Sequence, residues 1–395
     1  MLSRTLSQST ERNINANVSS GSRLVSIDAL RGFVMVIMLI DHIRETFYLH
    51  LQVSDPVDVY TTSPALFYTR FASAICAPVF IWLTGLSAYL YAQRHTKNET
   101  AAFLLKRGLF LIFLELTVVV FLWAGKYPPN IFYLQVIWCI GFCMISLAGL
   151  IYLPRKVILM IGIAIVAGHN LLDGFKLDES SPFYVIWAIL YQREVLDFGG
   201  IVARTSYPFL PWVGVIALGY VSGLWFSNAS TPENRQKTLL KFGLIGMLSF
   251  ILIRGINVYG DFAWINTGEF STTLMSFLAL TKYPPSFMFS LSMLSLGILF
   301  LYFFDKNDQS KFTKIMSHFG AAPMFYYIFH LAFLRILYLI GITIYGPNEG
   351  KYLSFPSVGY IWLSFVLFTV ILYFPTKWFA DFKKRNRHIA WLKYF

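Results

Sequence analysis

The first long apolar segment of this 395-residue sequence carries side chains that can do acid–base chemistry. Asp28, Arg31, His42 and Glu45 follow one another at spacings of three, eleven and three residues. Because a helix turns about 100° and rises about 1.5 Å per residue, all four fall on one stripe, and Arg31 and His42 stand roughly 16 Å apart. Ionisable groups in a membrane helix usually face a bundle interior or a wet cavity, and they mark function.

The residue types of this stripe predict a general base and an anion-binding group. His42 can accept a proton near neutral pH, with Asp41 or Glu45 fixing its tautomer and orientation. Arg31, backed by Asp28, can hold an anionic group that enters from the cytoplasm. The alternative is a structural role in which buried ion pairs pin the helix, and it has more weight for Asp28 and Arg31 than for His42.

Composition indicates that membrane helices position this stripe. Hydrophobic residues make up 56% of the chain and charged residues 13%, whereas a soluble domain carries about 25% charged residues. A helix needs about 20 apolar residues to span a bilayer, and about ten segments qualify. They fall near residues 28–49, 66–92, 102–124, 131–152, 156–172, 207–226, 238–260, 285–304, 318–343 and 357–380. The predicted fold class is therefore an all-α polytopic transmembrane helix bundle of about ten spans.

Lysine and arginine positions predict the orientation of these spans. They concentrate on the alternate loops that share a side with the N-terminus, which is the positive-inside pattern. We therefore expect both termini in the cytoplasm and the protein in the inner, cytoplasmic membrane of the cell. The net charge of +12 follows from this topology, so no nucleic acid is expected as a partner. The few basic residues on the expected outer side are Lys126, Lys176, Arg193, Arg204, Lys282 and Lys351.

Two regions of the chain are distinguished by composition. Residues 1–22 are rich in Ser, Asn, Thr and Gln and are expected to be a disordered cytoplasmic tail, with no signal peptide. Residues 23–395 form the membrane domain. Its apolar piece at 183–190 is too short to span and is expected to be an interfacial or re-entrant helix. No cluster of His, Cys and carboxylates has metal-site spacing, so no metal is expected.

Further polar residues in apolar segments are candidates for substrate binding. His330 can hydrogen-bond an acceptor, or it can be a satisfied histidine between helices. Arg70, Arg254 and Arg335 are expected near the outer ends of their helices, where together they would favour an anionic or sugar acceptor. Snorkelling to the interface is the alternative for each of them. Glu115 is expected to pair with one of these arginines.

Several motifs together resemble a known family. The run Asp28-Ala29-Leu30-Arg31-Gly32, continued by Asp41-His42 and Arg44, resembles the opening of bacterial membrane proteins related to heparan-α-glucosaminide N-acetyltransferase. More widely, it is similar to transmembrane acyltransferases in which an Arg-Gly precedes a histidine of the first helix by eleven residues. The resemblance covers about residues 23–395 and continues in Arg70-Phe71, Cys76–Phe80, Thr84-Gly85, Tyr207–Trp212, Gly219-Tyr220, Leu280–Ser286, Phe319–Tyr327, His330-Leu331, Trp378-Phe379 and Trp391-Leu392.

The resemblance implies an enzyme that moves an acetyl or other acyl group from cytoplasmic acyl-CoA to an acceptor, a sugar or glycan, on the far side of the membrane. It implies that His42 is catalytic. The lysosomal enzyme itself has an Asn at the corresponding position and a key His in the loop after that helix; the nearest residue here is His50, which is kept as an alternative. Acetyl-CoA or another acyl-CoA, the acceptor and the lipid bilayer are then the partners, and a homodimer is left open.

Two other functions compete with the enzyme. In a secondary transporter or permease, the same polar stripe would relay protons or bind substrate at the membrane midplane. In a structural or partner-binding membrane protein the stripe would have no task, and buried ionisable groups count against that reading. Proton-coupled uptake without CoA would favour the transporter.

Overall fold

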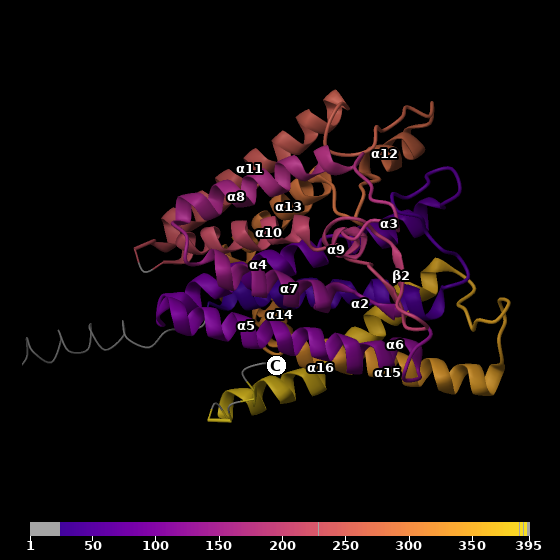
Figure 1. Ribbon diagram of the computed structural model, residues 1–395. Helices are drawn as coiled ribbons and strands as arrows, with labels where there is room; N and C mark the ends of the chain where they lie inside the picture. The colour runs from indigo at the N-terminus through magenta and orange to yellow at the C-terminus, as the bar shows by residue number, and fades with distance from the viewer. Residues whose placement is uncertain (1–23, 228, 387, 390, 393–395) are drawn as a thin grey trace, which may run out of the picture.

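The computed structural model describes residues 24–227, 229–386, 388–389 and 391–392. The chain is mostly helical, and its long helices run broadly alongside one another (Figure 1). A small sheet and several short helices gather at one end of this bundle. The tail expected over residues 1–22 lies outside the described residues.

Seven helical segments of the described chain are long and apolar enough to cross a bilayer. They are Pro64–Ala92, Lys97–Ala124, Arg155–Leu172, Pro232–Ile256, Phe287–Lys306, Pro323–Tyr345 and Val358–Arg385. Two shorter apolar helices cover Val136–Leu150 and Leu210–Phe226. The helix with the polar stripe, α2, has 23 residues over Val25–Phe47. Apolar helices of this number and length are those of an integral membrane protein.

The individual elements subdivide these segments. The α-helices after α2 are α3 (Pro64–Ala72), α4 (Cys76–Ala92), α5 (Lys97–Leu114), α6 (Val120–Ala124), α7 (Val136–Leu150), α8 (Arg155–Gly168), α9 (Tyr184–Leu190), α10 (Leu210–Ser222), α11 (Pro232–Ile256), α12 (Phe270–Leu278), α13 (Phe287–Lys306), α14 (Lys311–Ala321), α15 (Pro323–Tyr345) and α16 (Val358–Arg385). A π-helical turn, η1 (Glu115–Val119), joins α5 to α6, and 3₁₀ turns η2 (His169–Leu172) and η3 (Gly223–Phe226) extend α8 and α10.

The expected span at 318–343 is wrong in its boundaries, because two helices meet within it. Helix α14 ends at Ala321, and Pro323 starts α15. Between them Ala322 leaves the helical region, with φ −136° and ψ 59°. A proline lacks the N–H that a continuous helix needs, but it fits the first turn of a new one. The break makes α14 and α15 two separate helices, so that α14 can pack against α2 independently of the direction of α15.

A contact between two glycines sets how α2 and α14 cross. A Cβ on Gly32 would lie 1.8 Å from the carbonyl oxygen of Met316. A Cβ on Gly320 would likewise lie 1.8 Å from the carbonyl oxygen of Asp28. Only glycines allow two helix backbones to approach this closely, which is how small residues join membrane helices. The crossing fixes the height of the neighbouring Arg31 in the bundle.

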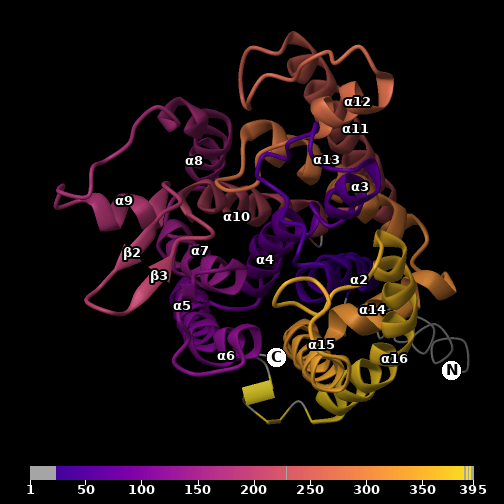
Figure 2. The ribbon, with the colours of Figure 1, turned by 90° about the vertical axis from the view of Figure 1, so that its right-hand side faces the viewer.

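The small sheet has the strand order β1-β3-β2, with β1 at Phe132–Tyr133, β2 at Val195–Asp197 and β3 at Val202–Arg204. Strand β3 pairs in parallel with β1 and antiparallel with β2. Leu196 of β2 is buried with Tyr184 and Ala188 of α9. The apolar piece expected as a short helix is therefore α9, seven residues long, and it packs on the sheet. In Figure 2 the sheet lies beside α5 and α7 at the end of the bundle.

Candidate active site

A cavity of about 370 Å³ follows one side of α2. Arg31, Met35, Met38, His42 and Glu45 all line it. Their spacings of three and four residues form the single helix face that the sequence predicts. Asp28, which was expected on the same stripe, does not line the cavity; its carboxylate accepts a hydrogen bond from Arg31 at 2.8 Å.

One end of this cavity contains the Arg31 guanidinium. Its Nη1 donates to Asp28 and, at 3.3 Å, to the carbonyl oxygen of Gly320. Its Nη2 donates to Ser87 Oγ of α4 at 2.9 Å. Arg107 of α5 also lines the cavity. Three helices thus hold Arg31 in one orientation, and two guanidinium groups line this end of the cavity.

His42 lies further along α2 and contacts a second histidine. Its Nδ1 is 2.6 Å from Nε2 of His330 on α15, and the two rings are stacked with 9° between their planes. His330 Nδ1 is 2.7 Å from the carbonyl oxygen of Tyr326. Both histidines are buried, at 8% and 0% exposure. The sequence analysis assigned His330 to acceptor binding. However, His330 lines neither this cavity nor the second cavity described below, and it contacts His42 from α15.

These contacts determine the tautomers if both rings are neutral. A carbonyl oxygen only accepts, so the Nδ1 of His330 must carry a hydrogen and its Nε2 must be the acceptor. The Nδ1 of His42 then donates to that Nε2. In a neutral imidazole the remaining nitrogen carries the lone pair. We therefore infer that His42 Nε2 is unprotonated and able to act as a base.

The expectation that Asp41 or Glu45 orients His42 is wrong in the described contacts. Both carboxylates bond to Arg44 instead: Asp41 Oδ1 lies 2.8 Å and Glu45 Oε1 3.1 Å from its Nη2. Residues one apart on a helix point about 100° apart, whereas residues three apart are neighbours. Asp41 therefore meets Arg44 at i+3, and His42 finds its partner on α15.

Two further donors surround the His42 ring. Trp123 of α6 packs edge-on against it at 5.3 Å, and Tyr327 of α15 does so at 5.9 Å between ring centroids. The Trp123 Nε1 and the Tyr327 hydroxyl are both buried, and neither has a hydrogen-bond partner among the described residues. Leaving such a donor unpaired is costly, so each needs an explanation.

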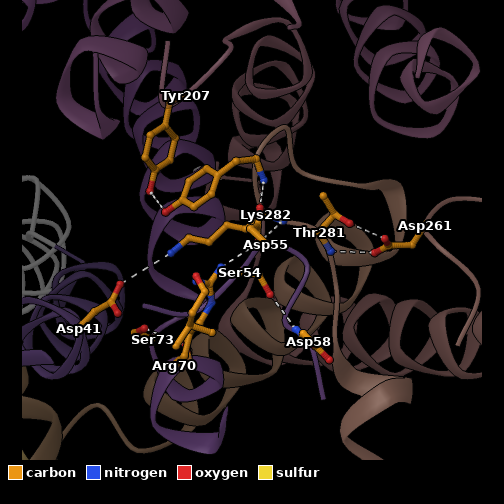
Figure 3. A network of polar contacts seen from close by, with 12 residues as sticks. Asp41, Ser54, Asp55, Asp58, Arg70, Ser73, Tyr207, Asp261, Thr281 and Lys282 are labelled. Carbon is orange, nitrogen blue, oxygen red and sulfur yellow. Dashed lines mark hydrogen bonds and ion pairs between the residues drawn. The ribbon is translucent and has the colours of Figure 1, made fainter. Parts of the chain in front are cut away.

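Lys282 points toward Asp41 from the loop between α12 and α13 (Figure 3). Its Nζ lies 3.9 Å from Asp41 Oδ2. Asp55 holds this loop, because its carboxylate accepts from the backbone N–H of Lys282 at 3.2 Å and of Tyr283 at 2.8 Å. Arg70 donates to the same carboxylate at 2.7 Å. Residues from four different segments therefore meet at this end of the cavity.

The loop is held at its other side as well. Asp261 accepts from the backbone N–H and the hydroxyl of Thr281, at 3.0 and 2.7 Å (Figure 3). The Tyr283 hydroxyl contacts that of Tyr207 at 3.0 Å. Burial opposes the charged form of Lys282, but the nearby Tyr283 and Asp41 outweigh it and raise the pKa of the ammonium. The lysine is thus a fixed positive charge beside Asp41.

A second cavity of about 810 Å³ adjoins the first. The two share seven lining residues, namely Glu45, Gln52, Tyr133, Gln135, Arg193, Arg204 and Tyr283. We call the first the inner cavity, the second the outer cavity, and these seven residues the shared wall. Basic side chains outnumber acidic ones around the outer cavity. They are Arg44, Arg70, Lys126, Arg193, Arg204 and Arg335, against Glu45, Asp55 and Glu115.

The structure separates the other candidate residues. Arg70 and Arg335 both line the outer cavity. Arg254 does not: it donates to the carbonyl oxygens of Phe262, Ser276 and Phe277, and so it holds a loop together. A guanidinium has five donors, and carbonyls from two separate segments, at residue 262 and at residues 276–277, accept from it. His50 lines neither cavity; its ring lies edge-on to Tyr48.

The structure also corrects the expected partner of Glu115. No arginine pairs with it in the described contacts. Its Oε2 accepts from the backbone N–H groups of Ile137 and Trp138, at 3.1 and 3.2 Å. These groups belong to the first turn of α7, where a helix has unpaired N–H groups and a partial positive charge. Glu115 therefore caps α7 from the π-helical turn.

The sequence analysis missed Lys282, Arg193, Arg204, Trp123 and Tyr327 as site residues. Lys282 lay inside a motif noted only for resemblance, and the two arginines were counted only for orientation. Their presence among the few basic residues of the expected outer loops was the available signal. Trp123 and Tyr327 gave none, because aromatic residues are common in every span. Within the described part of the chain no group of three or more His, Cys, Asp and Glu could hold a metal.

Fold and site together define a polytopic membrane protein with a buried histidine that lines one of two adjoining cavities. Residues 23–259 match the family described as heparan-alpha-glucosaminide N-acetyltransferase, catalytic. This is more than half of the chain, so the protein belongs to that family and is a membrane acetyltransferase in class. The match includes His42, Arg193 and Arg204 but ends before Lys282 and His330. Among curated proteins no match was found.

Proposed function

We propose that the protein transfers an acetyl or other acyl group from cytoplasmic acyl-CoA to a sugar or glycan acceptor at the outer side of the membrane. The observation that carries this proposal is the position of His42: it lines an inner cavity that starts at Arg31 and adjoins a larger, basic outer cavity. A donor and an acceptor can then reach one base from opposite ends. Family membership supports the reaction class.

The proposed topology has ten spans with both termini cytoplasmic, and the protein in the inner membrane. Helices α2, α7 and α10 would add three spans to the seven long apolar segments. Basic residues at the Arg31 end support the orientation. Arg235 of α11 reaches Asp305 of α13, which also accepts from Ser26 of α2. These helix ends therefore lie together, on the side where lysines and arginines concentrate.

In the proposed donor site, Arg31 and Arg107 hold the phosphates of CoA, with Asp28 orienting Arg31. Guanidinium groups suit phosphate because they offer paired donors in a plane. Arg31 and His42 stand roughly 16 Å apart along α2. Met35 and Met38 line the stretch between them, and a flexible thioether surface accepts an extended chain. The thioester would then lie beside His42.

The proposed transfer follows general base catalysis. His42 Nε2 removes the proton from an acceptor hydroxyl or amine as its oxygen or nitrogen bonds to the thioester carbonyl carbon. The tetrahedral intermediate collapses with breakage of the C–S bond. The CoA thiolate leaves and takes the proton from the imidazolium, so base and proton are both restored. His330 acts as a positioning residue, because it fixes the tautomer that leaves Nε2 free to accept.

The two unpaired donors beside His42 complete the proposal. An oxyanion develops on the thioester carbonyl oxygen, and preorganised donors lower its energy in a water-poor site. The rings of Trp123 and Tyr327 lie 5.3 and 5.9 Å from the His42 ring, measured between centroids. Their buried donors, Trp123 Nε1 and the Tyr327 hydroxyl, have no acceptor among the described residues. We assign them to this oxygen. Their unsatisfied state without substrate is then part of the site's preorganisation.

The test is acetyl-CoA turnover by detergent-purified protein with the His42→Ala variant. Removal of a general base costs about 10²–10⁴-fold in rate. His95→Gln is the matched control, since His95 is exposed and distant from both cavities. We expect loss of turnover in His42→Ala with an unchanged elution profile on size exclusion, and wild-type turnover in His95→Gln. Unaltered turnover in the His42 variant would remove the catalytic assignment.

A secondary transporter is the second candidate, because two adjoining cavities would also serve alternating access. In that case the protein in vesicles would take up substrate with protons in the absence of CoA. Uptake that requires no CoA, combined with no acetyl-CoA turnover, would favour the transporter over the enzyme.

A further inference from the structure

Two arginines of the shared wall stand out by their position in the small sheet. In the antiparallel pair β2–β3, Val195 lies opposite Arg204. Arg193 lies two residues before Val195, just outside β2, and Thr205 still donates to the carbonyl oxygen of Glu194 there. Since side chains alternate along an extended backbone, Arg193 falls on the face of Val195 and Arg204. Arg193 and Arg204 are then diagonal neighbours, which long side chains can bridge. The opposite face carries buried Leu196 and packs on α9.

The same face continues across the third strand. Tyr133 of β1 pairs with Arg204 in the parallel register, and all three residues line both cavities. Arg193 also lies over the Tyr283 ring, with its guanidinium carbon 5.1 Å from the centroid. Both arginines therefore line the junction of the cavities, Arg204 from strand β3 and Arg193 from the segment just before β2.

Neither arginine has a carboxylate partner among the described residues. The nearby acids are already engaged: Glu45 with Arg44, Asp55 with Arg70, and Glu194 with the side chain of Gln192. Arg193 Nε is buried and has no hydrogen-bond partner in the described chain. Burial and the nearby Arg204 lower the pKa of Arg193, which reflects the mutual repulsion of the pair.

Two like charges held close together, with no carboxylate paired directly to either among the described residues, cost free energy unless an anion joins them. A pair of guanidinium groups offers several directed donors to one phosphate, sulfate or carboxylate group. The remaining basic residues of the outer cavity add to the positive potential there. The pair is therefore arranged for a ligand that carries at least one negative charge.

We propose that Arg193 and Arg204 bind an anionic group of the acceptor and so place its hydroxyl or amine at His42. The acceptor class is thus a sugar or related alcohol or amine bearing a phosphate, sulfate or carboxylate. This inference rests on the proposed function. The phosphates of CoA are the other source of such an anion, but they already have Arg31 and Arg107 at the far end of the inner cavity.

The first experiment measures anion binding directly. Inorganic sulfate is titrated into the purified full-length protein, and the melting temperature is followed against sodium chloride of equal ionic strength. We expect sulfate to stabilise the wild type, and the double variant Arg193→Gln/Arg204→Gln to bind it at least roughly tenfold more weakly, since charge-assisted hydrogen bonds are lost. Lys176→Gln, an exposed outer-loop substitution, is the matched control and should behave as the wild type.

The second measurement identifies the source of the anion and checks the fold. Acetyl-CoA affinity of the double variant should equal that of the wild type, which also shows that the variant is folded. A tenfold loss of acetyl-CoA affinity would assign the pair to CoA and overturn the proposal. So would sulfate stabilisation that is absent in the wild type or equal in the double variant.

The two proposals fail in different ways. Arginine-dependent sulfate binding without any acetyl-CoA turnover by the wild type would remove the acyltransferase, and with it the acceptor role of the pair, while leaving an anion site. Turnover that depends on His42 but sulfate binding that ignores the arginines would remove the anion site and leave the acyltransferase.

Discussion

The two ends of the inner cavity are built in different ways. At the Arg31 end, the functional side chain is held by a neighbour three residues before it on α2 and by the close crossing of α2 with α14. At the His42 end, the site combines α2, α15, the loop that carries Lys282 and the segments around β2 and β3 that carry the two arginines. The first end contains an ion pair local to α2 besides its contacts with α4 and α14, whereas the His42 side chain at the second end is held by long-range contacts.

This difference teaches which end tolerates change. A local ion pair on a helix survives shifts of the surrounding bundle, because both partners move together. The His42 end needs several segments to be correct at once, and a misplacement of about 1 Å can cost 100-fold in rate. We therefore expect the largest functional effects from residues that position His42, and smaller effects from Arg31 and its partner.

The largest expected effect after loss of His42 itself comes from His330. In His330→Ala, the Nδ1 hydrogen of His42 loses its acceptor and the base loses its tautomer, so kcat should fall by roughly 10²–10⁴-fold. The KM for acetyl-CoA should not change. His330→Gln offers a carbonyl oxygen as acceptor and should recover part of the loss. Equal kcat values for the two variants would contradict a tautomer role.

The next effect concerns the oxyanion assignment. Tyr327→Phe removes one donor and keeps the ring that packs on His42. Loss of one such donor costs about 10²–10³-fold in kcat. Tyr326→Phe is the matched control, because its hydroxyl is also buried and unpartnered but lines neither cavity. Equal effects of the two substitutions on kcat would argue that Tyr327 only packs.

A structural test addresses the glycine crossing at the Arg31 end. Gly32→Ala places a Cβ 1.8 Å from a carbonyl oxygen of α14, so the helices must separate. Overpacking of this kind costs about 1–3 kcal/mol of unfolding free energy. Gly149→Ala in α7 is the control, since its Cβ meets nothing within 4 Å. Melting temperatures in detergent measure both, and a stable Gly32→Ala would mean that the crossing is loose.

The donor end should give a smaller effect on rate. Arg31→Gln removes the charge that would hold a CoA phosphate, so the KM for acetyl-CoA should rise roughly tenfold. Because Arg31 is distant from the reacting atoms, kcat should change little. Initial rates over a range of acetyl-CoA concentrations separate the two constants. A fall in kcat with constant KM would place Arg31 in a different role.

The smallest effect is a pH dependence from Asp55. Burial raises the pKa of this carboxyl, and the charges of Arg70 and Lys282 with the backbone N–H groups offset burial only in part. The folded state therefore binds its proton more tightly than the unfolded chain does. Stability from this group is present below its ordinary pKa and is lost as pH rises through the raised value. As pH rises from mildly acidic to neutral, the melting temperature of the wild type should therefore fall relative to that of Asp55→Asn. Parallel curves for the two proteins would contradict this prediction.

The sequence predicted the helical membrane fold and the face of α2 that carries Arg31 and His42, since both depend on local hydropathy and helix period. It did not predict the partner of His42, because His330 is 288 positions away and periodicity carries no information on tertiary contacts. The assignment of Glu115 to an arginine failed for a related reason: a helix N-terminus competes for a carboxylate, and its location is known only once α7 is placed.

The shared wall also affects how easily ions could leak across the membrane through the two cavities. Two adjoining chambers that together follow a membrane helix would be a route for ion leakage if their junction were neutral. Arg193, Arg204 and the nearby Lys282 instead surround the junction with fixed positive charge. Fixed positive charges raise the barrier for hydrated protons and metal cations. The charges that we propose bind an anionic acceptor would thus also oppose the passage of protons and metal cations through the protein.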